Sequence, residues 1–307
     1  MGKYVVRRLL LMIPTFLGAT LLIFFLNFAL PGDPTAGRCG ERACPPNYVA
    51  WFKEYYGLDQ PFFVQYWMYL KKLLTGDLGT NYYNNSVIHE LVIRYPTTVR
   101  LALIAVVVEV VIGVAAGIVA GLRKGKFIDS LVTVSTLVVI AIPVFVLGVL
   151  AQLTFGIKLR WFAVTATEGT WEQLILPGFV LGSLYVAYVA RLTRSSLVDN
   201  LGADYVRTAR AKGMSNTRAI GVHALRNSLV PVVTYVGASF GGLMGGAIVT
   251  ERIFNINGIG GLIFRSINQR DGTTLVGAVV VLVVVYMMMT LLVDLLYSVL
   301  DPRISHG

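Results

Sequence analysis

The sequence predicts an all-α membrane protein, a polytopic bundle of six transmembrane helices. Of its 307 residues, 56% are hydrophobic and 14% are charged, and the mean hydropathy is +0.70; in a soluble domain about a quarter of the residues are charged. Six apolar stretches have the length of about 20 residues that crosses a bilayer, at 9–30, 98–122, 130–152, 174–192, 229–250 and 274–297. Within lipid the backbone must satisfy its own hydrogen bonds, so we expect each stretch to be a helix.

The first stretch, 9–30, is expected to be a membrane span that is not cleaved. It is too long for the core of a signal peptide, and no small-residue cleavage site follows it. The loop after it, 31–97, contains Cys39 and Cys44. If this loop faces an oxidising compartment, the two cysteines are expected to form a disulfide, since a metal site needs more ligands than this neighbourhood offers.

Two segments of the same loop favour short amphipathic helices. Residues 47–58 and 61–74 have aromatic and aliphatic side chains at helical spacing. Trp51 and Trp67 are expected at the outer membrane surface, where tryptophan is enriched. Such helices either cover the bundle or dock another protein, and the spacing does not distinguish the two.

The basic residues predict the orientation of the chain. Its net charge is +10, and Lys and Arg are concentrated before the first span, between the second and third spans, and in the segment 193–228. Because positive loops stay in the cytoplasm, both termini and 193–228 are expected inside and the loop 31–97 outside. Nucleic acid is not an expected partner, because no soluble segment interleaves basic and aromatic residues.

Glycines and one acidic residue inside the spans indicate where helices pack closely and where a polar interior or cavity lies. The second and fifth spans each have glycines four residues apart, which lets helix backbones approach closely: Gly113, Gly117 and Gly121 in one, Gly237, Gly241 and Gly245 in the other. The fifth set is expected either to pack within the chain, or to face a partner subunit or a path that opens. Glu109 is the acidic residue well inside a span; a structural or cavity-lining role is favoured over a proton relay.

The sequence offers no catalytic machinery and no cofactor site. It lacks the G-x-x-x-x-G-K-[ST] motif that binds the phosphates of ATP. Its three histidines, His89, His223 and His306, are far apart and have no clustered ligands. We therefore expect a non-enzymatic membrane protein that holds no metal.

The cytoplasmic segment 193–228 is expected to project from the membrane as two short helices around a glycine. A helix containing Tyr205 and Ala209 ends at Gly213, and Ser215 or Asn216 begins the second helix. A projecting helix pair of this kind fits a groove on another protein. A basic hairpin that lies on lipid headgroups is the alternative, and periodicity does not separate the two.

This segment resembles the cytoplasmic EAA loop of ABC importer permeases, whose pattern is E-A-A, three residues, Gly, nine residues and I-x-L-P. Gly213 and its spacing to Leu225 match, whereas the first Glu, the Ile and the Pro are absent. The segment is similar to the peptide-type variant in "DYVRTARAKGMS" and "HALRNSLVPVV". Along the rest of the chain the resemblance continues in "RRLLLMIPTFLGATLLIFFLNFALPGDP", "LLTGDLGTNY", "IPVFVLGVLAQLTFGIKLRWFAV" and "LLVDLLYSVLDPRI". The chain thus resembles the B-type permease subunit of the dipeptide/oligopeptide/nickel ABC importers.

The resemblance implies a type I ABC importer permease fold in two parts. Residues 1–97 would form the N-terminal span with its outer loop, and residues 98–307 a five-helix core. It also implies a homologous second permease, two cytoplasmic ATPases that bind ATP and Mg, an extracytoplasmic solute-binding protein, and short peptides as substrates. Nickel, haem or another solute is the alternative cargo; a stand-alone secondary transporter that uses Glu109, or a membrane scaffold, is the alternative of another class.

The resemblance also assigns three groups of site residues. The ATPase is expected to contact Tyr205, Arg207, Ala209, Arg210, Lys212, Gly213, Met214 and Ser215. The translocation path is expected to be lined by Glu109, Tyr235, Ser239, Phe240 and Met244. The loop that faces the binding protein is expected to include Phe254, Asn255, Asn257 and Gly258.

Overall fold

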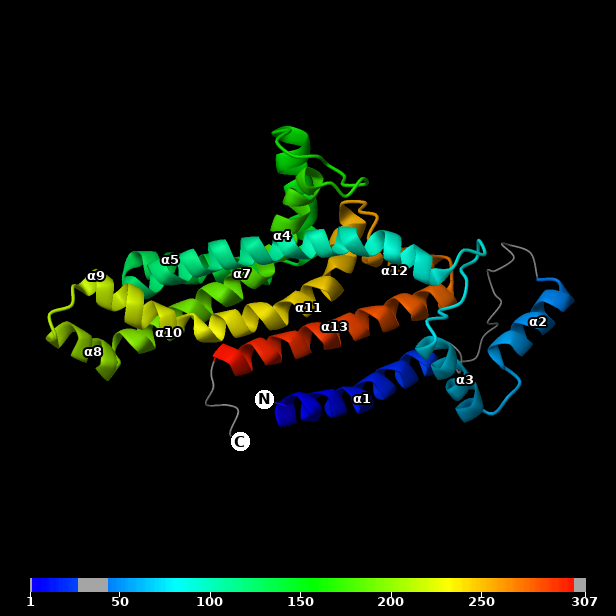
Figure 1. Cartoon of the computed structure of the whole chain (residues 1–307). Coiled ribbons are helices and arrows are strands. Elements are labelled where there is room, and N and C mark those ends of the chain that lie inside the picture. Colours follow the sequence, from blue (N-terminus) through cyan, green and yellow to red (C-terminus); the bar gives the residue numbers. More distant parts are fainter. Residues whose placement is uncertain (1, 27–43, 301–307) are drawn as a thin grey trace. The chain divides into compact units, whose positions relative to one another are not determined.

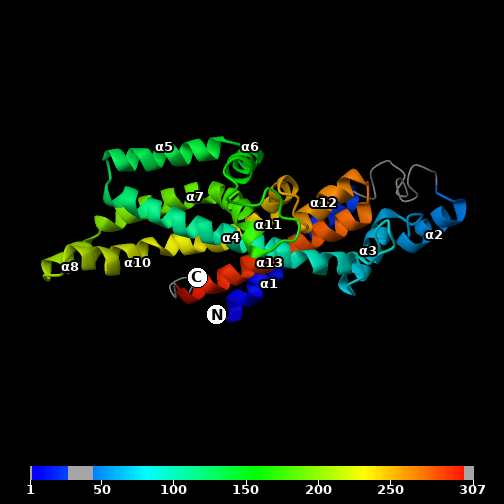
Figure 2. The same ribbon diagram turned by 90° about the horizontal axis from the view of Figure 1, so that it is seen from above.

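A computed structural model describes residues 2–26 and 44–300, and the secondary structure of this part of the chain is helical, without a strand (Figures 1 and 2). The helices are α1 (Gly2–Phe24), α2 (Pro46–Tyr56), α3 (Phe62–Leu74), α4 (Val87–Leu122), α5 (Phe127–Ala141), α6 (Val144–Ala151), the π-helix η2 (Gln152–Lys158), α7 (Trp171–Leu201), α8 (Asp204–Ala211), α9 (Asn216–Arg218), the π-helix η3 (Ala219–Leu225), α10 (Arg226–Ser228), α11 (Val230–Ile253), α12 (Ile259–Asn268) and α13 (Gly272–Leu300). The predicted all-α class is confirmed. Cys39 lies outside the described residues, so its disulfide with Cys44 stays a prediction.

Within residues 2–26 and 44–300, five helical segments are long and apolar enough to cross a membrane: Val5–Phe24, Val87–Leu122, Trp171–Leu201, Asn216–Gly245 and Gly272–Leu295. A sixth span is formed only if Phe127–Ala141 and Val144–Lys158 are counted together, and these two are bent by 99°. The prediction of one continuous helix over 130–152 is therefore wrong, because the chain bends between α5 and α6. Pro143 explains the break, because the residue before a proline avoids helical geometry and Ile142 is extended, with φ −86° and ψ 124°.

α1 begins at Gly2 instead of residue 9, and α4 and α7 also run past their predicted limits. α4 begins at Val87, and α7 continues to Leu201. An ion pair between Glu90 and Arg94, one helical turn apart, supports the early turns of α4. The loop helices predicted over 47–58 and 61–74 are present as α2 and α3.

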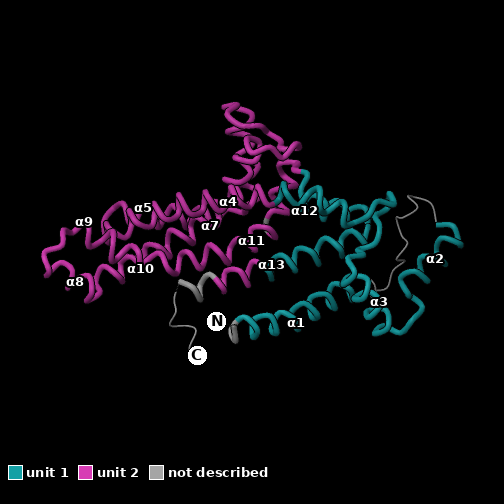
Figure 3. The backbone as a smooth tube through the Cα atoms, in the orientation of Figure 1, with its two compact units in different colours: residues 1–98, 257–288 teal, residues 99–256, 289–307 magenta. Residues whose placement is uncertain are grey.

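The chain forms two compact units, coloured separately in Figure 3. Unit 1 comprises 1–98 and 257–288, and unit 2 comprises 99–256 and 289–307. Unit 1 thus contains α1, α2, α3 and α12 with parts of α4 and α13. The functional division predicted after residue 97 stays a prediction.

Glycines let α4 and α7 approach closely inside unit 2. A Cβ built on Gly113, Gly117 or Gly121 of α4 would lie 2.7, 2.5 and 3.1 Å from atoms of Val189, Ala190 and Leu197 of α7. In return, a Cβ on Gly178 or Gly182 of α7 would lie 2.4 or 2.6 Å from Ile104 or Ala105 of α4. Contacts under 3.0 Å leave no room for a side chain, so the predicted close approach of the second span is made within this chain.

The glycines of α11 divide between packed and open positions. A Cβ on Gly237 would lie 2.6 Å from Val293 of α13, and one on Gly242 would lie 3.1 Å from the Tyr185 hydroxyl of α7. A Cβ on Gly245 would have no described atom within 4 Å. One part of α11 therefore packs within unit 2, where α7 lies next to both α5 and α11 (Figures 1 and 2).

Candidate functional site

The segment 193–228, which the sequence predicts to be cytoplasmic, forms a small folded extension of unit 2. α8 and α9 lie at one end of this unit in both views (Figures 1 and 2). Val206 of α8 is fully buried and packs in a cluster with Leu197 of α7 and Ala224 of η3, which Ile118 and Leu201 border. α8 is therefore held against the end of α7 and against η3.

A left-handed turn at Gly213 separates the two predicted helices. Its φ is +83°, a conformation that glycine adopts without steric cost. The turn is closed by hydrogen bonds from the Gly213 N–H to the Arg210 carbonyl, at 2.9 Å, and from the Met214 N–H to the Ala209 carbonyl, at 3.2 Å. These bonds satisfy carbonyls that the end of α8 would otherwise leave unpaired.

The second helix of the loop is less regular than predicted. Ser215 occupies the predicted N-cap position, but its side chain makes no capping hydrogen bond. α9 is only three residues long and continues into the π-helix η3 and then α10. Within η3, Ala219 and Ala224 are buried, whereas Gly221 is exposed and a Cβ there would have open space around it.

Most of the predicted ATPase-contacting residues lie on the outside of this extension. Tyr205, Arg207, Arg210, Lys212, Gly213 and Ser215 are exposed, and Met214 is half-buried. Ala209 is different, because it is only 8% exposed and faces its own chain. Arg207 makes an ion pair with Asp204 at 3.5 Å, but both side chains are largely exposed, so the pair adds little stability. The exposed face is basic and available to a partner.

An ion pair between α5 and α7 was not predicted from the sequence. Arg194 of α7 donates two hydrogen bonds to Asp129 of α5, one of them at 2.7 Å. Asp129 also accepts the Gly125 N–H at 2.9 Å, so it ties the loop between α4 and α5 to α7. The signal in the sequence is Asp129 itself, an acidic residue in the first turn of a helix.

Two of the predicted path residues meet in the interior of unit 2. Glu109 of α4 is fully buried, and Ser239 of α11 is 6% exposed. The Ser239 hydroxyl lies 2.9 and 3.1 Å from the two carboxyl oxygens of Glu109, and 2.9 Å from the Val236 carbonyl of its own helix. This contact links α4 to α11 and gives the buried acid the hydrogen-bond partner that its position requires.

We expect Ser239→Ala to destabilise the protein by about 1–3 kcal/mol, because it leaves the buried Glu109 carboxyl without its partner. The measurement is the thermal stability of the purified protein. Ser183→Ala is the matched control, since the Ser183 hydroxyl donates to the Val180 carbonyl one turn back in its own helix, α7, and does not link two helices in the described part of the chain. Equal losses in the two variants would contradict a specific role of the Glu109–Ser239 contact.

The remaining predicted path residues lie elsewhere on α11. The Tyr235 ring stacks on Tyr188 of α7, with centroids 6.2 Å apart, and Arg191 lies 5.3 Å from the Tyr188 ring. Tyr188 was not among the residues predicted from the sequence. Phe240 is half-buried and Met244 is buried.

The predicted loop toward the binding protein has both buried and exposed residues. In unit 2, Phe254 is fully buried and its carbonyl accepts the Ala166 N–H at 2.8 Å, while Asn255 is exposed with a φ of +51°. In unit 1, Asn257 is exposed, and Gly258 is buried at the start of α12. The two asparagines are thus the members of this group that face outward.

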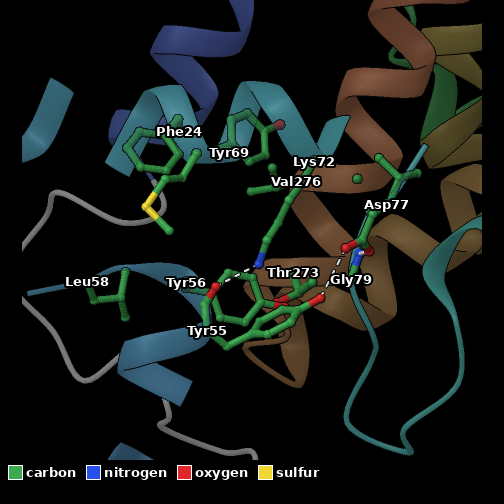
Figure 4. Close-up of a pocket in the computed structure, with 13 residues that line it drawn as sticks. Phe24, Tyr55, Tyr56, Leu58, Tyr69, Lys72, Asp77, Gly79, Thr273 and Val276 are labelled. Carbon is green, nitrogen blue, oxygen red and sulfur yellow. Dashed lines mark hydrogen bonds between the residues drawn. The ribbon is translucent and has the colours of Figure 1, made fainter. Parts of the chain in front are cut away.

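In unit 1, a pocket between α2, α3 and α13 is built around Lys72 (Figure 4). The Lys72 ammonium donates to the Tyr55 carbonyl at 2.6 Å and lies 3.3 Å from the centre of the Tyr55 ring. The Tyr55 hydroxyl donates to Asp77 at 3.1 Å, and the Gly79 N–H donates to the same carboxylate at 2.9 Å. These contacts fasten α2 to α3 and to the loop that follows.

The electrostatics of this pocket follow from burial. Burial lowers the pKa of Lys72, and nearby Asp77 opposes that change. Burial, followed by the hydrogen bond to Asp77, raises the pKa of Tyr55 to about 12, and burial also raises the pKa of Tyr69. The cavity volume of about 30 Å³ holds a water or two. It is too small for a peptide, so we interpret the pocket as structural.

Known transport proteins resemble the chain over its whole length. Residues 113–306 match the family described as binding-protein-dependent transport system inner membrane component, and residues 1–102 match the corresponding N-terminal region. The chain is 39% identical over 334 residues to a dipeptide transport system permease protein of Alkalihalophilus pseudofirmus. It is 38% identical over 307 residues to a glutathione transport system permease protein of Salmonella paratyphi A, and both alignments cover 100% of each chain. A crystal structure of an amino acid ABC transporter with histidines is 20% identical, with 76% of this chain and 97% of that chain covered and a TM-score of 0.48.

Proposed function

Because the chain belongs to the family of binding-protein-dependent transport system inner membrane components, we propose that it is the non-catalytic permease subunit of an ATP-driven importer for short peptides. The observation that carries this proposal is the exposed basic extension formed by α8 and the Gly213 turn, packed through Val206 on the ends of the membrane helices. A helix that is bound in a groove of an ATPase and moves as a rigid element can transmit the conformational change of the ATPase to the membrane spans.

We assign the binding of ATP to partner subunits and not to this chain. Among the described residues no group of His, Cys, Asp or Glu could hold a metal ion, and the sequence lacks a phosphate-binding loop. ATP and Mg would be bound by two cytoplasmic ATPases that receive the exposed residues of α8. A homologous second permease would complete the path, and a solute-binding protein would deliver the cargo. Both termini would then be cytoplasmic.

Short peptides are the cargo that the relatives favour. Two full-length relatives are named as permeases for a dipeptide and for glutathione, and glutathione is itself a tripeptide. Of the predicted path residues, Tyr235 and Phe240 of α11 are half-buried and have surface to offer a peptide, whereas Glu109, Ser239 and Met244 are buried in unit 2. Nickel, haem or another solute is the alternative cargo of the same architecture.

The direct test is uptake. The tagged chain would be purified from native membranes with its associated subunits, reconstituted in vesicles, and supplied with ATP, labelled dipeptides or tripeptides and the binding protein. We expect ATP-dependent peptide accumulation. If ATPases copurify but no peptide is taken up, the peptide cargo is contradicted while the assignment as an importer subunit stands. If no ATPases copurify, the coupling role of α8 is contradicted.

A second prediction separates the importer from a stand-alone carrier that uses Glu109. Glu109→Gln should keep ATP-dependent uptake within about twofold of the parent, because an amide can still exchange a hydrogen bond with Ser239. A carrier that relays protons through Glu109 would lose transport in this variant and would work from an ion gradient without ATP. Glu109→Ala is the comparison, since it removes the hydrogen-bonding group altogether.

A further inference from the structure

α3 in unit 1 presents an apolar and aromatic face with a lysine in it. Phe63, Trp67 and Leu74 are 78%, 62% and 77% exposed, and Lys71 is exposed on the same helix. Trp67 and Lys71 are four residues apart, so they lie on one face of the helix. An exposed face that combines aromatic rings with a cation is typical of helices at a membrane–water boundary.

A groove runs beside this face, within unit 1. Its volume is about 480 Å³, within the range of sites that bind small apolar molecules. Leu70 and Met287, which are 6% and 8% exposed, form its buried part. The rest of the lining comes from α1, α3 and α13 and includes Ile13, Phe16, Trp67, Lys71, Val284 and Met288. Apart from Lys71, the lining is apolar or aromatic.

The two adjacent lysines of α3 have different surroundings. Lys72 turns inward, where it donates to the Tyr55 carbonyl and covers the Tyr55 ring (Figure 4). Lys71 lines the groove, and within the described residues its ammonium has no hydrogen-bond or ion-pair partner. An ammonium at the edge of an apolar groove attracts an anionic group. The apolar side chains beside it favour contact with a hydrocarbon chain.

We propose that this groove binds an anionic phospholipid, with its phosphate at Lys71 and one acyl chain between α1, α3 and α13. α1 is a candidate membrane span of which only 6% is buried within the chain, so the wall of the groove faces whatever surrounds the protein in the bilayer. Lysine is depleted from protein–protein interfaces, whereas tryptophan beside lysine is usual at the headgroup level of a membrane. A lipid therefore fits this lining better than a partner subunit does.

The test uses Trp67 as a reporter of the bound lipid. In the full chain, purified with its associated subunits, Trp51, Trp161 and Trp171 are replaced by Phe. The protein is then reconstituted in phosphatidylcholine vesicles that contain a minor fraction of either dibrominated phosphatidylglycerol or dibrominated phosphatidylcholine. At equal bromine content we expect about fivefold more efficient quenching of Trp67 by the anionic lipid, which corresponds to one lysine acting near the surface.

Variants of the lysine separate a site from a general surface charge. Lys71→Gln should abolish the preference and Lys71→Arg should keep it. Lys53→Gln, which removes a lysine from the last turn of α2, should leave it unchanged. Equal quenching by the two lipids in the parent, or an equal loss in Lys53→Gln, would overturn the assignment to Lys71. If neither lipid quenches Trp67, the proposal that the groove binds a lipid is wrong, and a partner protein covers the groove instead.

Discussion

Replacing Gly117 by Ala should lower the stability of the protein more than any other single methyl group added to α4. The new Cβ would lie 2.5 Å from the carbonyl oxygen of Ala190 and 2.5 Å from the Cβ of Thr193, both on α7. One of these is a backbone atom, so the strain cannot be relieved by a side-chain rotation. Overpacking costs about 1–3 kcal/mol, more than the gain of about 1 kcal/mol that Ala brings to a helix.

The measurement is the temperature at which the purified protein loses its monodisperse state. Gly18→Ala in α1 is the matched control, because a Cβ there has no described atom within 4 Å, and we expect it to leave the midpoint unchanged or slightly raised. A Gly117→Ala protein as stable as the parent would show that α4 and α7 do not pack through this glycine in the membrane.

Replacing Gly213 by Val should separate ATP hydrolysis from transport. The φ of +83° at this position is costly for an L-residue and most costly for a β-branched one. A Cβ here would have open space around it, so the penalty comes from the backbone rather than from a clash. At about 1–2 kcal/mol, the penalty corresponds to about a tenfold loss of uptake, while insertion and basal ATP hydrolysis should persist.

A graded series makes this prediction specific. Asn tolerates the left-handed region better than other non-glycine residues, so uptake should fall in the order Gly, Asn, Ala and Val at position 213. Gly221→Val is the control from the same loop, since Gly221 is exposed, has open space for a Cβ and lies in η3 without a positive φ. Normal uptake by a stably expressed Gly213→Val protein would contradict the coupling assignment.

The sequence by itself determined the membrane class, the helical nature of the long apolar runs and the position of the Gly213 turn, although residues 27–30 of the first run lie outside the described residues. Each of these depends on local properties, namely the length of an apolar run, the periodicity of a helix and the left-handed conformation of one glycine. The broken third span could have been anticipated from Pro143, because the restriction on Ile142 is also local. From its apolar composition alone, the run 130–152 was predicted to be one helix.

Only the tertiary structure decided which distant residues meet. Glu109 and Ser239 are 130 residues apart in the chain, and Asp129 and Arg194 are 65 apart. Whether Gly117 is crowded and Gly245 open depends on which helix packs against each. Lys71 and Lys72 are neighbours in the sequence, yet Lys72 is half-buried against a tyrosine ring and Lys71 lines a groove. Such contacts depend on helix rotation and packing, which the pattern of a single segment does not encode.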